Sequence, residues 1–191
     1  MQETILSICL GVGLAASVGF RVFLPLLAVS LAGHYGVIPL NGDWQWIGSN
    51  AALIVLSVAT IIEILAYYIP WFDNLLDTIA IPLAAVAGTA VMVSTVANLS
   101  HVVTWALAII AGGGTAATVK STMGASRLTS TATTGGLANP VIATAETGTA
   151  TIMSVLSVFL PLLAIIFVII LFFGLRKVYK KLFVRSSGNS I

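Results

Sequence analysis

The chain has 191 residues, of which 59% are hydrophobic and only 7% are charged, and its mean hydropathy is +1.10. Soluble domains carry about 25% charged residues, so the composition excludes a soluble protein and indicates one transmembrane domain over residues 1–191. With one cysteine and two histidines the chain cannot form an intramolecular disulfide or a cysteine zinc site, and we expect no metal and no cofactor.

The first apolar segment runs from about Thr4 to Ala32 and contains Arg21 and Pro25. A transmembrane helix needs about 20 residues. Because this segment is longer, it is either one long kinked helix or two half-helices that form a re-entrant hairpin. In a hairpin, Arg21 lies near the tip, where it can reach Glu63 of the next segment.

The second apolar segment covers residues 47–69 and predicts a span with Glu63 as its only charge. Trp44 and Trp46 precede it and are typical of side chains that anchor a helix at the membrane surface. Pro70 ends the segment, since proline cannot continue the hydrogen bonding of a helix.

Two carboxylates follow this proline. Asp73 and Asp77 are spaced i, i+4, which places them on one face of a helix. The pattern predicts a short interfacial helix that precedes the third span, at residues 81–99.

A fourth span is expected at residues 102–123, with an interruption at glycines 112–114 and with Lys120 near its end. A polar stretch rich in threonine and glycine follows, at residues 130–140. A bilayer offers no water to backbone amides, so this stretch must be buried in protein, line a wet cavity or lie at the surface. It is therefore the first place to look for a functional site.

The asparagine–proline pair at 139–140 predicts the start of the last helical region, with the asparagine as N-cap. The region extends to about Lys181, which is too long for one span. We expect a short first part that contains Glu146, a break near Gly148 and a span at residues 152–175. The fold class is thus all-α, a polytopic bundle of about five spans with broken or re-entrant helices.

The basic residues gather in the tail, residues 176–191, as Arg176, Lys177, Lys180, Lys181 and Arg185. An excess of lysine and arginine marks the cytoplasmic side, so we expect a multi-pass protein of the inner membrane with a cytoplasmic C-terminus. Tracing the expected spans back from the tail places the polar stretch and most interior charges on the outer side.

An ionisable residue at the centre of a span costs about 2.5–3.5 kcal/mol or more, so each one needs a partner or a wet path. Arg21 and Glu63 either form a structural ion pair or contact a ligand. Lys120 and Arg127 near a helix start favour an anion, such as a phosphate or a lipid headgroup, whereas the carboxylates favour a cation or a proton relay. The candidate substrate- or ion-binding residues are Arg21, Glu63, Asp73, Asp77, Lys120, Arg127, Thr131, Thr133, Thr134, Asn139 and Glu146.

The signatures of common enzyme classes are missing. The sequence contains no HExxH, no GxSxG and no Walker-type loop, so we expect no catalytic residues and no enzyme activity. The expected partners are membrane lipids and, through small-residue seams such as Gly11/Gly13 and Ala84/Gly88, a second copy of the chain. Nucleic acid is not expected as a partner.

Several motifs together resemble a family of small bacterial membrane proteins, domain of unknown function 4126. They are Gly13–Arg21 with Phe23–Leu27, Glu63 with Ile69–Asp77, Ala111–Gly114, and Ser130–Pro140 with Glu146. The resemblance covers nearly the whole chain and implies a compact multi-span fold, without an activity. The chain departs from the family at Tyr67 and Tyr68, where relatives often carry a basic residue that could pair with Asp73 or Asp77.

Two functions fit these patterns. The first is a small transporter or channel-like protein that binds a small solute, ion or anionic headgroup at an outer-side polar cavity. The alternative is a membrane scaffold or assembly factor whose polar residues only hold helices together. A wet pocket from Glu63 to the polar stretch favours the first, and fully paired, dry side chains favour the second.

Overall fold

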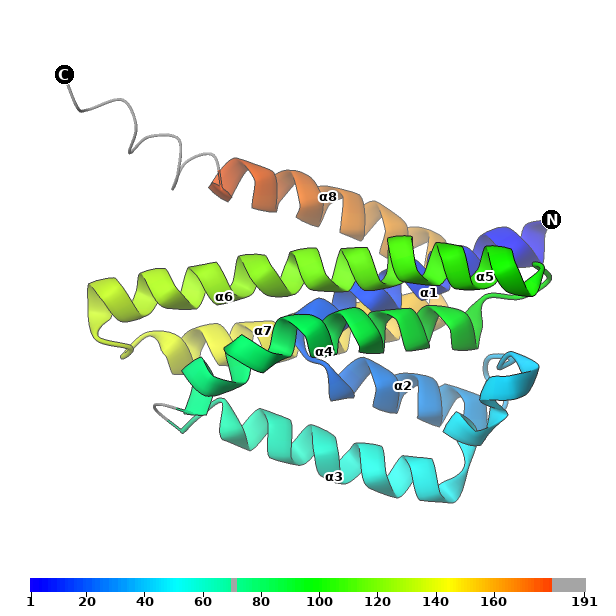
Figure 1. Cartoon of the computed structure of the whole chain (residues 1–191), viewed down its shortest axis with the longest axis horizontal. Helices are drawn as coiled ribbons and strands as arrows, with labels where there is room; N and C mark the ends of the chain where they lie inside the picture. The colour runs from blue at the N-terminus through cyan, green and yellow to red at the C-terminus, as the bar shows by residue number, and fades with distance from the viewer. Residues whose placement is uncertain (70–71, 180–191) are drawn as a thin grey trace.

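The computed structural model describes residues 1–69 and 72–179, and of residues 72–75 and 175–179 it describes the backbone alone. This part of the chain is helical and contains no strand, which confirms the all-α prediction. The elements are α1 (Gln2–Phe20), α2 (Phe23–His34), η1 (Gly42–Gly48), α3 (Asn50–Ala66), α4 (Phe72–Thr95), α5 (His101–Leu107), η2 (Ala108–Gly113), α6 (Gly114–Thr134), α7 (Asn139–Phe159) and α8 (Pro161–Tyr179) (Figure 1).

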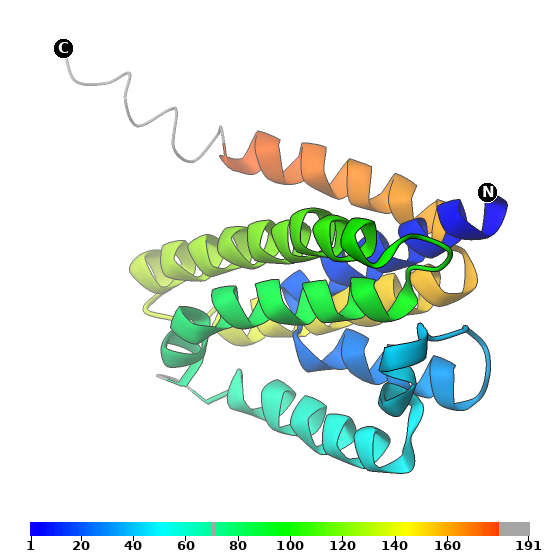
Figure 2. The same ribbon diagram turned by 45° about the vertical axis from the view of Figure 1, so that its right-hand side comes forward.

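The first apolar segment is a hairpin of two helices. The helix α1 ends at Phe20, Arg21 is extended with φ −137° and ψ 127°, and α2 returns toward the end where the chain begins (Figures 1 and 2). Pro25 lies in the first turn of α2, where the missing N–H has no helical partner to lose. The chain therefore turns back at Arg21, as the hairpin alternative predicts, but α1 is not a half-helix. With 19 residues it is long enough to cross a membrane by itself, and α2 is the shorter returning helix.

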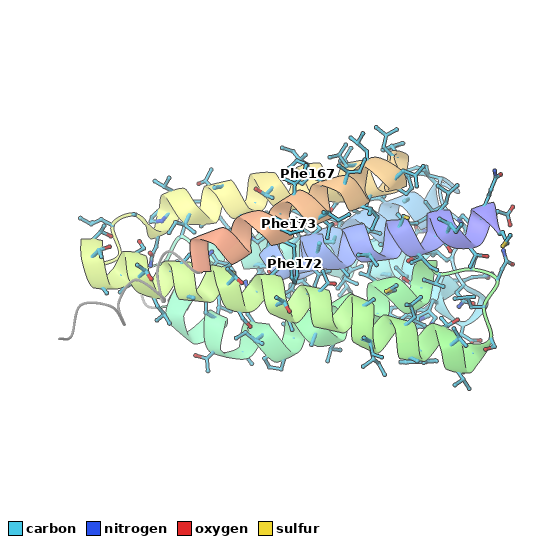
Figure 3. All side chains as sticks on the ribbon, turned by 90° about the horizontal axis from the view of Figure 1, so that it is seen from above. Phe167, Phe172 and Phe173 are labelled. Atoms are coloured by element: carbon cyan, nitrogen blue, oxygen red, sulfur yellow. The ribbon has the colours of Figure 1, made fainter. Side chains whose placement is uncertain are left out.

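Within residues 1–69 and 72–179, four helices are long and apolar enough to cross a membrane, and a fifth span results if the bent pair η1 and α3 is counted as one. This agrees with the expected number of about five. The surface suits lipid, because large apolar side chains of α3 and α8 are exposed. Phe167, Phe172 and Phe173, for example, lie along α8 (Figure 3).

The helix α1 lies at the centre of the bundle and packs against α4, α6, α7 and α8. Glycine permits a close approach of backbone to backbone between α4 and the π-helical turn η2. A Cβ on Gly88 would lie 2.7 Å from the carbonyl oxygen of Gly112. Two of the three glycines predicted to interrupt this span, Gly112 and Gly113, therefore serve a tight helix crossing, whereas Gly114 faces open space. The chain stays helical through all three.

Two predicted boundaries near the charged residues are wrong. Residues 72–95 form one helix with Pro82 inside, so Asp73 and Asp77 belong to the first two turns of a span and not to a separate interfacial helix. The helix α6 continues to Thr134, so the polar stretch is largely helical. The threonine hydroxyls of the stretch explain this, because they form hydrogen bonds within the helix. Thr133, for example, donates to the carbonyl of Thr129, one turn earlier.

The expected break near Gly148 is also wrong. The helix α7 runs without interruption to Phe159, and the chain turns at Leu160, so that α8 begins at Pro161. As a result α7 starts beside the end of α6 and runs to the opposite end of the bundle. The helix α8 then runs back toward the end of α6 (Figures 1 and 2). A cytoplasmic C-terminus and an outer-side polar cluster therefore cannot both hold.

Candidate functional site

Charged side chains from five elements meet around Tyr67, the residue that ends α3. We call this set the polar cluster and define it as Arg21, Glu63, Tyr67, Asp77, Lys120, Arg127 and Glu146. It lies at the tip of the α1–α2 hairpin, inside the half of the bundle where α6 ends and α7 begins. Three positive and three negative side chains balance each other within it.

The tightest contact of the polar cluster joins α6 to α7. The Arg127 guanidinium donates from Nε to Oε1 of Glu146 over 3.2 Å and from Nη2 to Oε2. The Arg127 and Glu146 side chains are only 1% and 3% exposed. A two-point arginine–carboxylate pair of this kind fixes both side chains in orientation.

Arg21 holds the tip of the hairpin against α7. Its Nε donates to the hydroxyl of Thr147 over 2.9 Å, and its Nη2 donates to the carbonyl of Ala143 over 2.8 Å. One turn earlier, Ser17 donates to the carbonyl of Ala150 over 2.8 Å. Arg21 is fully buried and lies at the C-terminal end of α1, where the helix dipole favours a positive charge.

Glu63 caps the N-terminal end of α2, across the break between α1 and α2 from Arg21. Its two carboxylate oxygens accept hydrogen bonds from the backbone N–H groups of Val22 over 2.7 Å and Phe23 over 3.0 Å. A carboxylate at a helix N-terminus satisfies orphan amides and complements the helix dipole. The ion pair considered for Arg21 and Glu63 does not form within 4 Å among the described residues, because Glu63 binds the backbone beside Arg21 instead.

Tyr67 is the centre of the polar cluster and was missed by sequence reasoning. The guanidinium carbons of Arg21 and Arg127 lie 4.2 and 4.1 Å from the centre of its ring. Lys120 Nζ donates to the Tyr67 hydroxyl over 2.9 Å, and this hydroxyl donates to Oδ1 of Asp77 over 3.2 Å. No sequence signal pointed to Tyr67, because a tyrosine near the end of an apolar segment ordinarily indicates an interfacial anchor.

Asp77 is the most loosely held carboxylate of the polar cluster. Its oxygens lie 3.9 Å from Lys120 Nζ and 4.0 Å from Arg127 Nε, and its side chain is 17% exposed. The other two carboxylates of the cluster are more buried and form shorter contacts. Asp77 therefore connects the buried charges with the outside of the bundle.

Two buried nitrogens of the polar cluster remain without a partner, Nη1 of Arg21 and Nη1 of Arg127. The Ser130 hydroxyl, which is not part of the cluster, is likewise buried without one. Each arginine uses its Nε and Nη2 atoms for the contacts above, so the opposite end of each guanidinium has free N–H groups. A buried N–H without a partner costs about 1–3 kcal/mol, so native proteins rarely leave one without a reason.

The structure brings together six of the predicted site residues and leaves others apart. Thr133 and Thr134 are exposed and donate to carbonyls of their own helix. Thr131 accepts a hydrogen bond from the Asn139 side chain over 3.1 Å. The N-cap of α7 is Ala138, so the prediction that Asn139 is the cap is wrong. The side chain of Asp73 lies outside the described residues.

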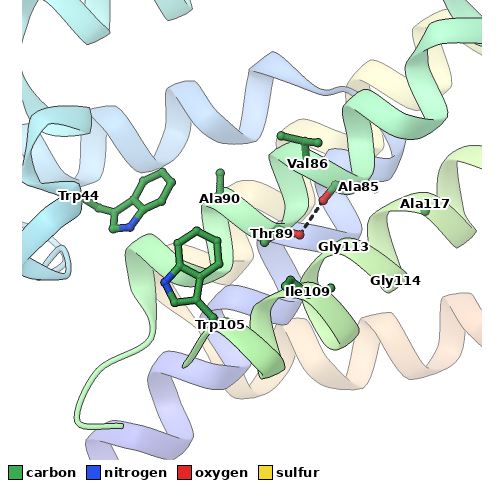
Figure 4. Close-up of a pocket in the computed structure, with 10 residues that line it drawn as sticks. All are labelled: Trp44, Ala85, Val86, Thr89, Ala90, Trp105, Ile109, Gly113, Gly114 and Ala117. Atoms are coloured by element: carbon green, nitrogen blue, oxygen red, sulfur yellow. Dashed lines mark hydrogen bonds between the residues drawn. The ribbon is translucent and has the colours of Figure 1, made fainter. Parts of the chain in front are cut away.

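A groove of about 540 Å³ opens elsewhere, between α4 and the α5–η2–α6 helix (Figure 4). Trp44 and Trp105 lie at one end, and Thr89 on its wall donates to the carbonyl of Ala85 over 2.8 Å. Its walls are otherwise apolar. The groove suits an acyl chain of the surrounding bilayer and offers no free polar group to a solute.

Comparison with known proteins identifies the chain by family. No curated protein and no solved structure matches it. A family model described as "Domain of unknown function (DUF4126)" matches residues 8–181, which include the whole polar cluster. The chain therefore belongs to the DUF4126 family, and it is a helical protein whose apolar helices are suited to span a membrane.

Proposed function

We propose that this protein is a small membrane carrier or channel-like protein that binds a solute at the polar cluster. The observation that carries the proposal is the pair of free guanidinium ends, on Arg21 and Arg127, in a site that is otherwise paired. Ionisable side chains inside a membrane bundle are costly, and they commonly mark the path of a substrate or ion.

The broken first segment supports the same proposal. In many transporters the substrate site lies where a membrane helix is interrupted, because the interruption releases backbone groups and helix dipoles inside the bundle. Here the interruption at Arg21 and Val22 lies directly beside the cluster, and Glu63 neutralises only the α2 side of it.

The alternative function, a scaffold or assembly factor, is favoured by a different observation. Nearly every charged group of the polar cluster has a partner: Arg127 binds Glu146, Glu63 caps α2, and Lys120 donates to Tyr67. Such a network could serve only to hold helices together. A scaffold, however, gives no reason for two buried arginine ends without acceptors.

Swelling of reconstituted vesicles tests the proposal without knowledge of the solute. We expect the wild-type protein to accelerate swelling in at least one of three iso-osmotic baths, which contain a neutral solute, a salt whose cation is tested or a salt whose anion is tested. An ionophore or a permeant counter-ion carries the opposite charge in the two salt baths. Arg21→Lys keeps the charge but loses the guanidinium end, so it should slow this swelling at least about tenfold. Thr133→Ala, on the exposed face of α6, should leave it unchanged.

Two outcomes contradict the proposal. One is that no bath distinguishes wild-type vesicles from protein-free vesicles. The other is that Arg21→Lys and Thr133→Ala behave alike. Either result favours the scaffold.

The orientation follows from the expected cytoplasmic tail. If the end of α8 faces the cytoplasm, the polar cluster lies in the cytoplasmic half of the bundle and not on the outer side. We expect a membrane-impermeant maleimide added to intact cells to label Asp43→Cys and not Thr133→Cys, both in a Cys9→Ser background. These positions lie in η1 and at the end of α6, at opposite ends of the bundle. Labelling of Thr133→Cys alone would show that the end of α6 faces the outside of the cell and would contradict this orientation.

A further inference from the structure

The charges of the polar cluster restrict what the solute can be. This step rests on the proposed function, since it names the chemical class of the solute at the same site. The carboxylates of the polar cluster each accept at least one hydrogen bond, Glu146 from Arg127, Glu63 from two amides and Asp77 from Tyr67. The buried side-chain atoms of the cluster that have no partner are the two arginine Nη1 donors. A site with free buried donors matches a ligand that offers acceptors.

The two free donors border the same aromatic ring. The guanidinium carbons of Arg21 and Arg127 lie 4.2 and 4.1 Å from the centre of the Tyr67 ring, so a ligand at the edge of this ring is the one that can reach both. Arg21 is held to α7 by two hydrogen bonds and Arg127 by its pair with Glu146. Their free ends are therefore fixed in place before any ligand arrives, which lowers the entropic penalty of binding.

A second constraint comes from charge. Arg21, Lys120 and Arg127 are balanced by Glu63, Asp77 and Glu146, so the polar cluster is neutral when all six are ionised. An anion that enters alone leaves an uncompensated negative charge in a buried site, which costs several kcal/mol. A proton that enters with the anion removes this penalty, and a carboxylate of the cluster is the group that can accept it.

Asp77 is the carboxylate best suited to take up this proton. Protonating Glu146 would break its two-point pair with Arg127, and protonating Glu63 would weaken the cap on α2. Asp77 is partly exposed, and its contacts with Lys120 and Arg127 are long. Its hydrogen bond from Tyr67 goes to one oxygen, which leaves the other oxygen to carry the proton.

We infer that the solute is a small oxyanion, a carboxylate or a phosphate, bound by the Nη1 ends of Arg21 and Arg127 and accompanied by one proton on Asp77. The anion supplies the missing acceptors, and the proton restores the neutrality of the cluster. Binding is then tighter at low pH. One linked proton changes the affinity by at most about tenfold for each pH unit.

Calorimetric titration of the full chain in detergent tests this inference. The probes are acetate, inorganic phosphate and a short-chain phosphatidic acid, which separate a free anion from a lipid headgroup. Each titration is repeated in two cationic buffers that differ in ionisation enthalpy, because the difference in heat counts the protons taken up. We expect at least one probe to saturate the protein and one proton to be taken up for each anion.

Conservative variants separate a binding role from a structural one. Arg21→Lys and Arg127→Lys keep the positive charges and should each weaken the affinity at least about tenfold, because the free guanidinium end is lost. Asp77→Asn should bind the anion without proton uptake and with little dependence on pH. Asp43→Asn is the matched control, since Asp43 is an exposed aspartate of η1, and it should behave like the wild type.

Each contrary result has a separate meaning. Anion binding that both lysine variants leave unchanged, or anion binding without proton uptake in the wild type, overturns the inference. If a cation or neutral solute binds at the polar cluster and no oxyanion does, the inference is wrong and the proposed function stands. If no solute of any class binds, both are wrong.

Discussion

Replacing Arg127 with leucine is expected to destabilise the folded protein by about 3–5 kcal/mol, because the change leaves Glu146 as an unpaired charge in a buried site. Glu146 is 3% exposed, and its two hydrogen bonds in the polar cluster come from Arg127. The lower stability of Arg127→Leu should appear as a lower midpoint temperature of thermal aggregation in detergent and as a smaller yield of monodisperse protein.

The double variant Arg127→Leu with Glu146→Leu is the decisive control for this prediction. Removing both partners of a buried ion pair is often nearly neutral, since neither charge then has to be buried. The double variant should therefore recover most of the stability that the single variant loses. Equal stability of the single variant and the wild type, or no recovery in the double variant, would contradict the buried pair.

Replacing Glu63 with alanine is expected to free the N-terminal end of α2. The amides of Val22 and Phe23 each lose their acceptor, at about 1–3 kcal/mol for each buried group. Hydrogen–deuterium exchange at these two amides should become at least about tenfold faster, while amides in the middle of α7 stay protected.

Two variants calibrate the result at Glu63. Glu63→Gln keeps one oxygen as an acceptor and should give an intermediate rate of exchange at the two amides. Glu3→Ala removes an exposed carboxylate of α1 and should have no effect on them. If Glu63→Ala exchanges like the wild type, the carboxylate does not cap the hairpin.

The parts of the fold that could be predicted from sequence are those with an unambiguous physical signal. Composition alone indicated a membrane bundle of about five spans. The excess length of the first segment, with Arg21 inside it, allowed only a kink or a hairpin. Choosing between the two required the knowledge that Glu63, far along the chain, caps the amides of Val22 and Phe23.

The errors arose where membrane helices tolerate residues that break helices in water. Gly148 lies in an uninterrupted α7, although a glycine in a long helical region suggested a break. The threonines of the polar stretch continue α6 because their hydroxyls donate to backbone carbonyls one turn earlier. The misplaced break also hid the separate returning helix α8, so the sequence did not predict that α6 and α8 end toward the same end of the bundle.

The composition of the candidate site was partly predictable. Buried charges in an apolar chain must find partners, so Arg127 and Glu146 could be singled out, but the sequence does not tell which acid meets which base. Tyr67 carried no such signal, because a tyrosine near the end of a span ordinarily indicates an interfacial anchor. Its role depends on helices distant in sequence that place two guanidinium groups over one ring.

The most direct test of the central claim, that the polar cluster is a binding site, is native mass spectrometry of the purified full chain. We predict that a bound small molecule or lipid remains on the wild-type protein and is lost from Arg21→Lys, at a temperature at which both proteins stay folded. A wild-type protein that carries nothing, or the same bound molecule on both proteins in equal amount, would contradict the claim and favour a purely structural network.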